Sequence, residues 1–307
     1  MKKILIMGGS GFIGRAVIEA YIERGIEVHA TFHKSKPSEN GKVVWHQIDL
    51  LDANGVNDLF AIVQPEFLIQ LAWCTGQGSY WKDEANLDWL AANLLIAKSF
   101  VRNGGNRCLF AGTSAEYDWS SNQPLDEYET NLEPLLLYGG SKLGLYWALK
   151  KYFEQHSVSF LWARFFNPFG EGEDPRRLIP KTCLRLLGGE NLVFDAAMSL
   201  RDFLHVKDVG NAIAHLLDSN LTGPVNVASG QAISVREVIS TIAEIYERSG
   251  QISFDSGDPV SNKPDAVVAN TRRLNLESGW KSNKTFKDRI TETCEWWMIE
   301  YKILQRK

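Results

Sequence analysis

The 307-residue sequence predicts an α/β protein in which a doubly wound parallel sheet precedes a smaller mixed α/β domain. Apolar runs of strand length alternate with amphipathic segments of helix length up to about residue 167. The first run ends in glycines and opens directly into a helix, whereas shorter elements with longer loops follow residue 168. Strands and helices that alternate at this spacing form a parallel sheet with right-handed crossovers.

The glycine-rich stretch at residues 3–14 reads KILIMGGSGFIG and predicts a binding site for a phosphate group. Gly8 permits a sharp turn, Gly11 leaves room for a pyrophosphate to approach the backbone, and Gly14 lets the helix pack closely on the strand. The free N–H groups of the first helical turn then face the anion. Because no Lys-Ser or Lys-Thr follows, the motif indicates a Rossmann-type dinucleotide site rather than a nucleoside-triphosphate loop.

The remaining elements follow one another in a regular order. Expected strands are apolar and short, and expected helices repeat their apolar residues with the helical period. We expect strands at 3–7, 26–32, 43–48, 67–73, 107–112, 159–166, 191–194, 201–206 and 224–228, and helices at 13–24, 54–63, 85–101, 136–155, 175–187, 208–217, 235–248 and from 285 onward.

We expect the chain to form two domains that meet near residue 167. Residues 1–167 form the dinucleotide-binding domain, and residues 168–307 form the substrate-binding domain. The helix at 206–219 and the strand at 224–228 are expected to pack back on the first domain.

Composition and charge exclude several classes of protein. A net charge of −4 and an isoelectric point near 5.9 give no electrostatic basis for binding nucleic acid. No apolar run reaches the length of about 18 residues that spans a bilayer. The four cysteines lie far apart without a C-x-x-C pair, which indicates neither a disulfide framework nor a metal site. We therefore expect a cytoplasmic protein with no nucleic-acid or membrane partner and no metal.

The residues that follow the second strand, 26–32, bear on the choice of cofactor. An NAD site carries an Asp or Glu there, which binds the adenosine ribose and repels a 2′-phosphate. This sequence reads HKSK instead, and His33 and Lys34 can donate hydrogen bonds to a 2′-phosphate. NADP (as NADPH) is therefore the first choice and NAD the second. Asp49 and Leu50, after the third strand, are expected to border the adenine.

Tyr138 and Lys142 lie four residues apart at the start of the expected helix at 136–155, so both side chains project from one helix face. A free phenol has a pKa of about 10, too high for ready proton exchange near neutrality. The Lys142 ammonium, together with an oxidised nicotinamide, favours the phenolate and lowers that pKa. Tyr138 can then give a proton to a carbonyl oxygen as hydride arrives from NADPH, and Lys142 is expected to bind the nicotinamide ribose.

Taken together, six motifs in this order resemble the extended short-chain dehydrogenases/reductases, a family of nucleotide-sugar epimerases, dehydratases and reductases. By this resemblance Thr113, four residues before Tyr117, holds the substrate oxygen beside Tyr138, with Ser114 as the alternative. The motifs are the glycine turn, the Tyr138–Lys142 pair, the Thr113 loop, R-F-F-N at 164–167, L-I-P at 178–180 and R-D-F-L-H-V-x-D-V at 201–209.

Departures from the patterns of subfamilies narrow the expected reaction. The 4,6-dehydratases carry an acid pair after the catalytic Thr, or a Glu two positions on; here Ser114 and Ala115 stand there, and Glu116 is out of phase by one. The GDP-fucose epimerase/reductases resemble S-x-C-I-Y, and this loop has no cysteine. We therefore expect reduction of a nucleotide-linked 4-keto-6-deoxyhexose by NADPH, in deoxysugar biosynthesis. The alternatives are an NAD-dependent nucleotide-sugar 4-epimerase and, more remotely, an inactive dinucleotide-sensing regulator.

The resemblance also implies residues for the nucleotide sugar. Asn167, Arg201 and, more weakly, Lys263 are expected to bind its nucleotide end, since arginine holds a phosphate with two parallel bonds. For Arg201 the alternative is an ion pair with Asp202 or a neighbouring acid. A homodimer through the helices at about 85–103 and 136–156 is expected from the family. The other expected cofactor contacts are Ser10, Phe12, Ile13, Leu71, Ala72, Trp73 and Phe165, and Trp73, Tyr80 and Trp81 are either an aromatic wall over the sugar or part of the core.

Overall fold

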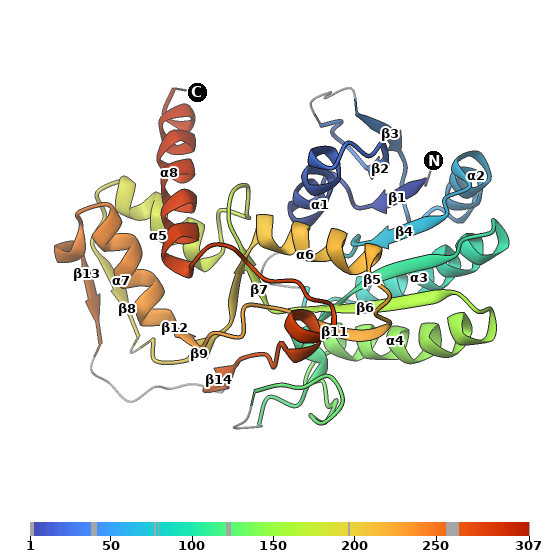
Figure 1. Ribbon diagram of the computed structural model, residues 1–307. Helices are drawn as coiled ribbons and strands as arrows, with labels where there is room; N and C mark the ends of the chain where they lie inside the picture. The colour runs from blue at the N-terminus through green and yellow to red at the C-terminus, as the bar shows by residue number, and fades with distance from the viewer. Residues whose placement is uncertain are drawn as a thin grey trace.

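A seven-stranded parallel sheet, in the order β11-β6-β5-β4-β1-β2-β3, forms the centre of the protein (Figure 1). The structure is a computed structural model, and it describes residues 3–37, 42–76, 78, 80–120, 124–195, 197–255 and 264–306. The strands of this sheet are β1 (Ile4–Met7), β2 (Val28–Phe32), β3 (Val43–Gln47), β4 (Phe67–Gln70), β5 (Arg107–Thr113), β6 (Ser159–Phe165) and β11 (Gly223–Val227).

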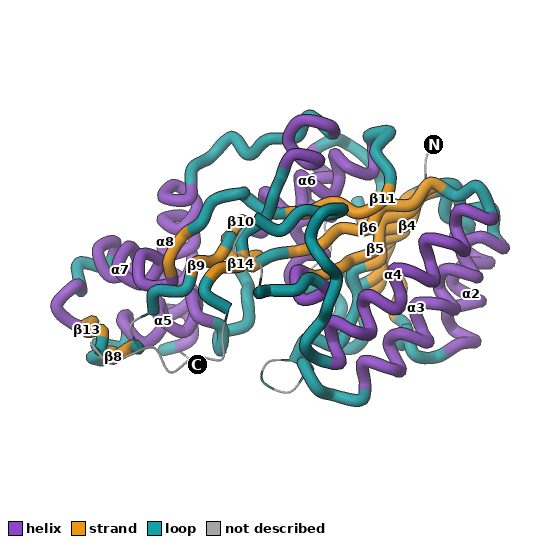
Figure 2. The backbone as a smooth tube through the Cα atoms, turned by 90° about the horizontal axis from the view of Figure 1, so that it is seen from below, coloured by secondary structure: helices purple, strands orange, loops and turns teal. Residues whose placement is uncertain are grey.

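Helices cover both faces of the sheet (Figures 1 and 2). Two helices that pack against each other lie on one face, and three lie side by side on the other. The first pair is α1 (Phe12–Glu23) and α6 (Val206–Asp218), and the second group is α2 (Ala53–Val63), α3 (Ala85–Arg102) and α4 (Leu137–Gln155).

The central strand β1 shows why the sheet is doubly wound. Its side chains alternate, so that Ile4 and Ile6 pack with α1 and α6 while Leu5 and Met7 pack with α2, α3 and α4. All four residues are buried, as expected for a parallel strand covered on both faces. The predicted fold class is confirmed.

The strand order reverses beside β1, which pairs with β2 on one side and β4 on the other. In open α/β sheets, ligands bind at the carboxyl ends of the strands at such a reversal. The glycine turn after β1 and the loop after β4 therefore lie at the expected binding position.

A smaller group of elements lies beside the sheet, on the side away from α2 (Figure 1). A third cluster of buried apolar residues holds its three helices together. Its elements are β7 (Asn167–Phe169) paired with β10 (Phe203–His205), β8 (Leu192–Phe194) with β13 (Ile252–Phe254), β9 (Leu200–Arg201) with β12 (Ile233–Ser234) and β14 (Ala266–Val267), and the helices α5 (Leu178–Leu187), α7 (Val235–Ile245) and α8 (Phe286–Leu304).

Two expected strands differ most from those in the structure. The strand expected at 67–73 ends at Gln70, where the Gln70 side chain accepts the N–H of Ala72 and turns the chain over the glycine loop. The strand expected at 201–206 is broken at Asp202, a fully buried residue whose carboxylate accepts N–H groups of Ser229 and Gly230. A buried carboxylate needs hydrogen-bond donors. Because these donors come from the loop at Ser229 and Gly230, the strand is interrupted at Asp202.

Candidate active site

A cavity of about 400 Å³ lies at the carboxyl ends of β1, β4, β5 and β6. It brings together most of the residues expected from the sequence to act on cofactor or substrate. These are Gly8, Ser10, Gly11, Phe12, Ile13, Gly14, Leu71, Ala72, Trp73, Thr113, Ser114, Tyr138, Lys142, Phe165 and Asn167.

The glycine turn is closed by backbone contacts that leave no room for side chains. Gly8 has a φ of +79°, and its carbonyl accepts the N–H of Gly11 at 3.0 Å. A Cβ on Gly14 would lie 2.2 Å from the Gly8 carbonyl, so the missing side chain lets α1 pack closely on the turn that follows β1. Further along, α1 packs on Ile4 and Ile6 of β1 itself. The buried Thr31 hydroxyl accepts the Gly8 N–H at 2.9 Å and ties the turn to β2.

Tyr138 and Lys142, from the first turns of α4, are both buried at the cavity wall. The Lys142 Nζ donates to the Ala111 carbonyl at 2.7 Å, and burial lowers the pKa of Lys142 to about 7 while the Glu116 charge opposes this. Burial also raises the pKa of Tyr138, which a hydrogen bond with Thr113 partly offsets. In the protein alone desolvation therefore raises the pKa of Tyr138, so the phenol carries its proton, as a proton donor must. The lowering expected with an oxidised nicotinamide stays a prediction.

Thr113 ends β5 and caps the short 3₁₀ turn η1 (Ser114–Glu116). Its hydroxyl accepts the Ala115 N–H at 3.2 Å and shares a hydrogen bond with Tyr138. Ser114 also lines the cavity, and its carbonyl accepts the indole N–H of Trp119 at 2.7 Å. The geometry favours the Thr113 hydroxyl over that of Ser114 as the partner of the phenol.

Glu116 lies beneath the cavity wall and is fully buried. Its carboxylate accepts the Thr113 N–H at 2.8 Å, the Trp162 indole at 3.0 Å and the Arg164 guanidinium at 2.7 Å. A Cβ on Gly112 would lie 2.8 Å from this carboxylate, which explains the glycine. Glu116 is thus committed to holding the end of β5 and is not positioned as an acid in the cavity.

Trp73, Tyr80 and Trp81 line the cavity and also pack in or against the core, so both alternatives for these side chains stay open. Tyr80 and Trp81 meet the Tyr138 ring edge to face, with centroids 5.0 and 5.5 Å away. Trp73 lines the same cavity, and its indole N–H donates to the buried Asn86 at 2.8 Å. Rings of this kind offer flat apolar faces to a sugar.

The residues expected around the adenine and the 2′-phosphate do not line this cavity. The His33 side chain is largely exposed, and its Nε2 lies 3.9 Å from an Asp49 carboxylate oxygen. Lys34 is exposed, whereas Leu50 is buried in the core on the α2 side. An acid therefore does lie beside the end of β2, but it comes from the end of β3.

Arg201 is not among the residues that line this cavity, and its expected contact with the nucleotide end of a substrate stays a prediction. Its Nη1 donates to the carbonyls of Leu200 at 2.8 Å and Pro264 at 3.1 Å, and burial lowers its pKa. The alternative ion pair with Asp202 is not formed either, since that carboxylate is occupied by Ser229. Lys263 lies outside the described residues.

The residue that sequence reasoning missed is Arg177, which precedes α5 and lines the cavity. Its Nε donates to Glu173 at 2.8 Å. Burial raises the pKa of Tyr80, and the positive charge of Arg177 partly offsets that rise. The only signal in the sequence was its place directly before the L-I-P motif.

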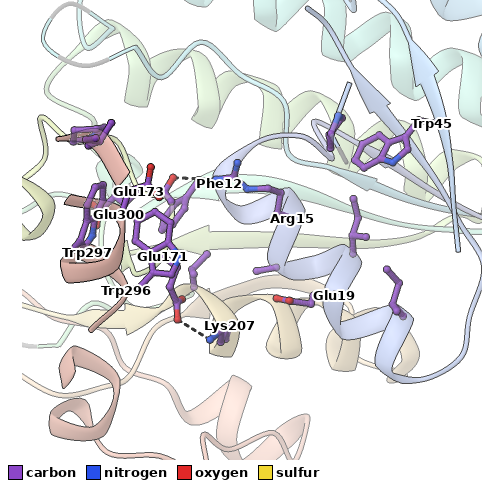
Figure 3. A pocket seen from close by; sticks show the side chains of 18 residues that line it. Phe12, Arg15, Glu19, Trp45, Glu171, Glu173, Lys207, Trp296, Trp297 and Glu300 are labelled. Carbon is purple, nitrogen blue, oxygen red and sulfur yellow. Dashed lines mark hydrogen bonds and ion pairs between the residues drawn. The ribbon is translucent and has the colours of Figure 1, made fainter. Parts of the chain in front are cut away.

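A larger cavity, of about 790 Å³, lies between α1 and α8 (Figure 3). Phe12 contributes to both cavities. Figure 3 shows that charged side chains here meet protein partners: Arg15 donates to the Gly172 carbonyl at 3.1 Å, and Lys207 pairs with Glu171 at 2.7 Å. Because its lining holds neither Tyr138 nor Lys142, we take the smaller cavity as the candidate active site.

Glu171, His205 and Glu292 place one ligand atom each within 4.8 Å of one another, as metal ligands do. The His205 Nδ1, however, accepts the Lys207 N–H, so the proton of a neutral ring lies on Nε2, which faces Glu171 at 3.3 Å. A metal ligand needs that nitrogen free of its proton. Two of the three residues instead have cationic partners of their own: Glu171 pairs with Lys207, and Glu292 pairs with Arg289.

A family model described as the NAD dependent epimerase/dehydratase family matches residues 4–228. The chain belongs to this family. It is 24% identical over 302 residues to a dTDP-4-dehydro-6-deoxyglucose reductase of Escherichia coli, covering 94% of this chain and 95% of the relative. It is also 26% identical over 317 residues to UDP-glucuronic acid decarboxylase 1 of Xenopus tropicalis, covering 97% and 73%.

Among solved structures, a UDP-glucose 4-epimerase of Thermotoga maritima matches with a TM-score of 0.87 and 19% identity, covering 97% of this chain and 99% of that one. At this identity the likeness bears on the fold alone. The curated relatives of this chain thus include a nucleotide-sugar reductase and a nucleotide-sugar decarboxylase. In the described residues, none of the helices has the length and apolar character needed to cross a membrane.

Proposed function

We propose that this family member uses NADPH to reduce the 4-keto group of a nucleotide-linked 4-keto-6-deoxyhexose. The supporting observation is the composition of the cavity: its described lining contains the Tyr138 phenol and the Lys142 amine but no carboxylate, imidazole or thiol. Dehydration and 3,5-epimerisation need a further acid or base to move protons on carbon. Transfer of a hydride to a carbonyl needs only one proton donor for the oxygen.

The residues present fit a dinucleotide: Gly8, Gly11 and Gly14 line the cavity, and α1 begins there at Phe12 without a side-chain cap on its first N–H groups. NADPH supplies a hydride when bound. Tyr138 gives its proton to the substrate oxygen, Thr113 holds that oxygen, and Lys142 stabilises the negative charge left on the phenol.

For the nucleotide end of the substrate, we propose Asn167 and Arg177 as contacts, because both line the cavity. Arg177 presents its guanidinium near Tyr80, where it can bind a diphosphate. We retain the division into domains at residues 1–167 and 168–307 as part of this proposal.

We further propose a homodimer through α3 and α4. Leu87 and Leu94 on α3 and Trp147 on α4 are exposed large apolar side chains. Sedimentation of the protein tests this: a monomer at micromolar concentration would contradict it.

A second candidate, an NAD-dependent nucleotide-sugar 4-epimerase, is favoured by one contact. The Asp49 carboxylate lies 3.9 Å from His33, near the place that a 2′-phosphate would take. It would repel that phosphate and admit NAD.

The experiment that separates these candidates follows NADPH and NADH oxidation with a panel of nucleotide 4-keto-6-deoxyhexoses. We expect loss of NADPH absorbance. Interconversion of a UDP-hexose with none of the panel reduced would identify the epimerase, and dinucleotide binding without any turnover would identify a regulator.

Tyr138→Phe should lower kcat about 10²- to 10⁴-fold while NADPH still binds.

A further inference from the structure

The Lys142 ammonium is buried without a bonded carboxylate. Its Nζ donates to the Ala111 carbonyl at 2.7 Å and lies 3.8 Å from the centroid of the Trp73 ring. No ion pair within the described part of the chain includes Lys142. Burying an ammonium ion is unfavourable unless something compensates its charge.

Among the other groups around Lys142, the Glu116 charge favours the ammonium form but makes no ion pair with it. Tyr138, on the same helix, and Cys74, after β4, are both protonated, because burial raises the pKa of each. Glu116, from η1, carries a charge that Arg164 neutralises at 2.7 Å. The Ala111 carbonyl on β5 and the Trp73 ring are therefore the groups in contact that favour the ammonium form.

The Trp73 ring is held in place over Lys142. Its indole N–H donates to the Asn86 side-chain oxygen at 2.8 Å. Asn86 is fully buried, and its amide nitrogen donates to the carbonyls of Tyr80 at 2.6 Å and Asp83 at 2.7 Å. The start of α3 thus fixes the ring that faces the amine on α4.

We propose that Trp73 is a positioning residue of this active site: its ring face keeps the buried Lys142 side chain in the ammonium form that the reduction requires. The link between this positioning role and catalysis rests on the proposed function. An indole face attracts a cation more strongly than any other side-chain ring, and more strongly when both are shielded from water. Replacing the ring by an aliphatic side chain removes that attraction and leaves the amine buried.

The direct test titrates Lys142 by NMR in protein labelled with ¹³C at the lysine Cε, with Lys142→Arg identifying the signal. We expect a pKa of about 7 in the unsubstituted protein. Trp73→Leu should lower it by about one unit, a tenfold change in proton affinity, and Trp73→Phe by less. If Trp73→Leu does not fold, Trp73→Phe makes the same comparison. An unchanged pKa in a folded Trp73 variant would overturn the proposal.

The matched control is Trp147→Leu, since Trp147 lies 5.2 Å from the Lys150 ammonium on the same helix but is half exposed. It should leave the Lys142 titration unchanged, and an equal shift would overturn the specific role of Trp73. With a substrate, the alkaline limb of kcat/KM should move down by the same amount in Trp73→Leu. Because the NMR titration needs no substrate, it judges this inference even if no nucleotide sugar is reduced.

Discussion

The backbone N–H of Thr113 donates at 2.8 Å to the carboxylate of Glu116, a residue with no exposed surface. The same carboxylate pairs with the equally buried Arg164. Removing one partner of such a pair leaves the other charge buried and unpaired, which costs about 3–5 kcal/mol. Glu116→Gln should therefore lower the free energy of unfolding by about that amount. It should also lower kcat, because the end of β5 loses its anchor. Chemical denaturation measures the first effect.

The double variant Glu116→Gln with Arg164→Met supplies the control. It removes both charges, so it should unfold at a higher denaturant concentration than Glu116→Gln alone. If Glu116→Gln and the double variant were equally stable, the ion pair with Arg164 would not be the source of the stability that Glu116 provides.

The two hydroxyls that end β5 should differ in their effect on catalysis. Thr113 shares a hydrogen bond with Tyr138, whereas Ser114 only lines the wall. Thr113→Ala should lower kcat about 100-fold, as loss of an oxyanion donor does, and Thr113→Ser should restore most of it. Ser114→Ala should stay close to the original rate. A reversed order would assign the role to Ser114.

Arg177 and its neighbour Arg176 form a matched pair for testing the nucleotide end. Arg177 lines the cavity, while Arg176 is exposed and pairs with Asp174 at 2.6 Å. Loss of a charge-assisted contact should raise the substrate KM about 10- to 100-fold in Arg177→Ala. Arg176→Ala should leave KM unchanged. The partner left behind, Glu173, can take up a proton because burial raises its pKa to about 7. Equal KM values in both variants would remove Arg177 from the site.

Glu127 should make the protein less stable as pH rises. Burial raises the pKa of this carboxyl from 4.5 to about 7, against a hydrogen bond from the Asn226 N–H. Between pH 4.5 and 7 the folded state holds a proton that the unfolded state lacks, so stability falls over that window by roughly 3 kcal/mol. Glu127→Gln should flatten this slope. Melting temperatures of both proteins at pH 5 and pH 8 measure this slope. Any destabilisation that the amide introduced by Glu127→Gln itself causes is the same at both pH values, so it cancels when the two are subtracted. Identical slopes would refute the prediction.

Local sequence was sufficient where one short segment determines both structure and chemistry. The run from Ile4 to Gly14 contains the strand, the turn and the helix start, so its place in the sheet could be predicted. Tyr138 and Lys142 likewise meet because helical spacing alone brings them to one face.

Contacts between distant segments were beyond such reasoning. Arg177 reaches the cavity only because α5 begins beside it, and His33 meets Asp49 only because β2 and β3 are neighbours. In the sequence Asp202 lies within a run that predicts an apolar strand. Its carboxylate is instead bonded to donors more than twenty residues further along the chain. The motif that contains Arg201 was recognised, but the hydrogen bond from its guanidinium to the distant Pro264 carbonyl could not be predicted from it.

The return of α6 and β11 to the large sheet limits how this protein can be divided. β11 pairs with β6 along five residues, and α6 packs along α1 (Figure 1). A fragment ending at residue 167 would leave β6 with an unpaired edge and uncover the apolar face of α1. Such a fragment should aggregate, so the catalytic half cannot be produced as an independent unit. Thermal unfolding of the whole chain should accordingly follow one cooperative transition.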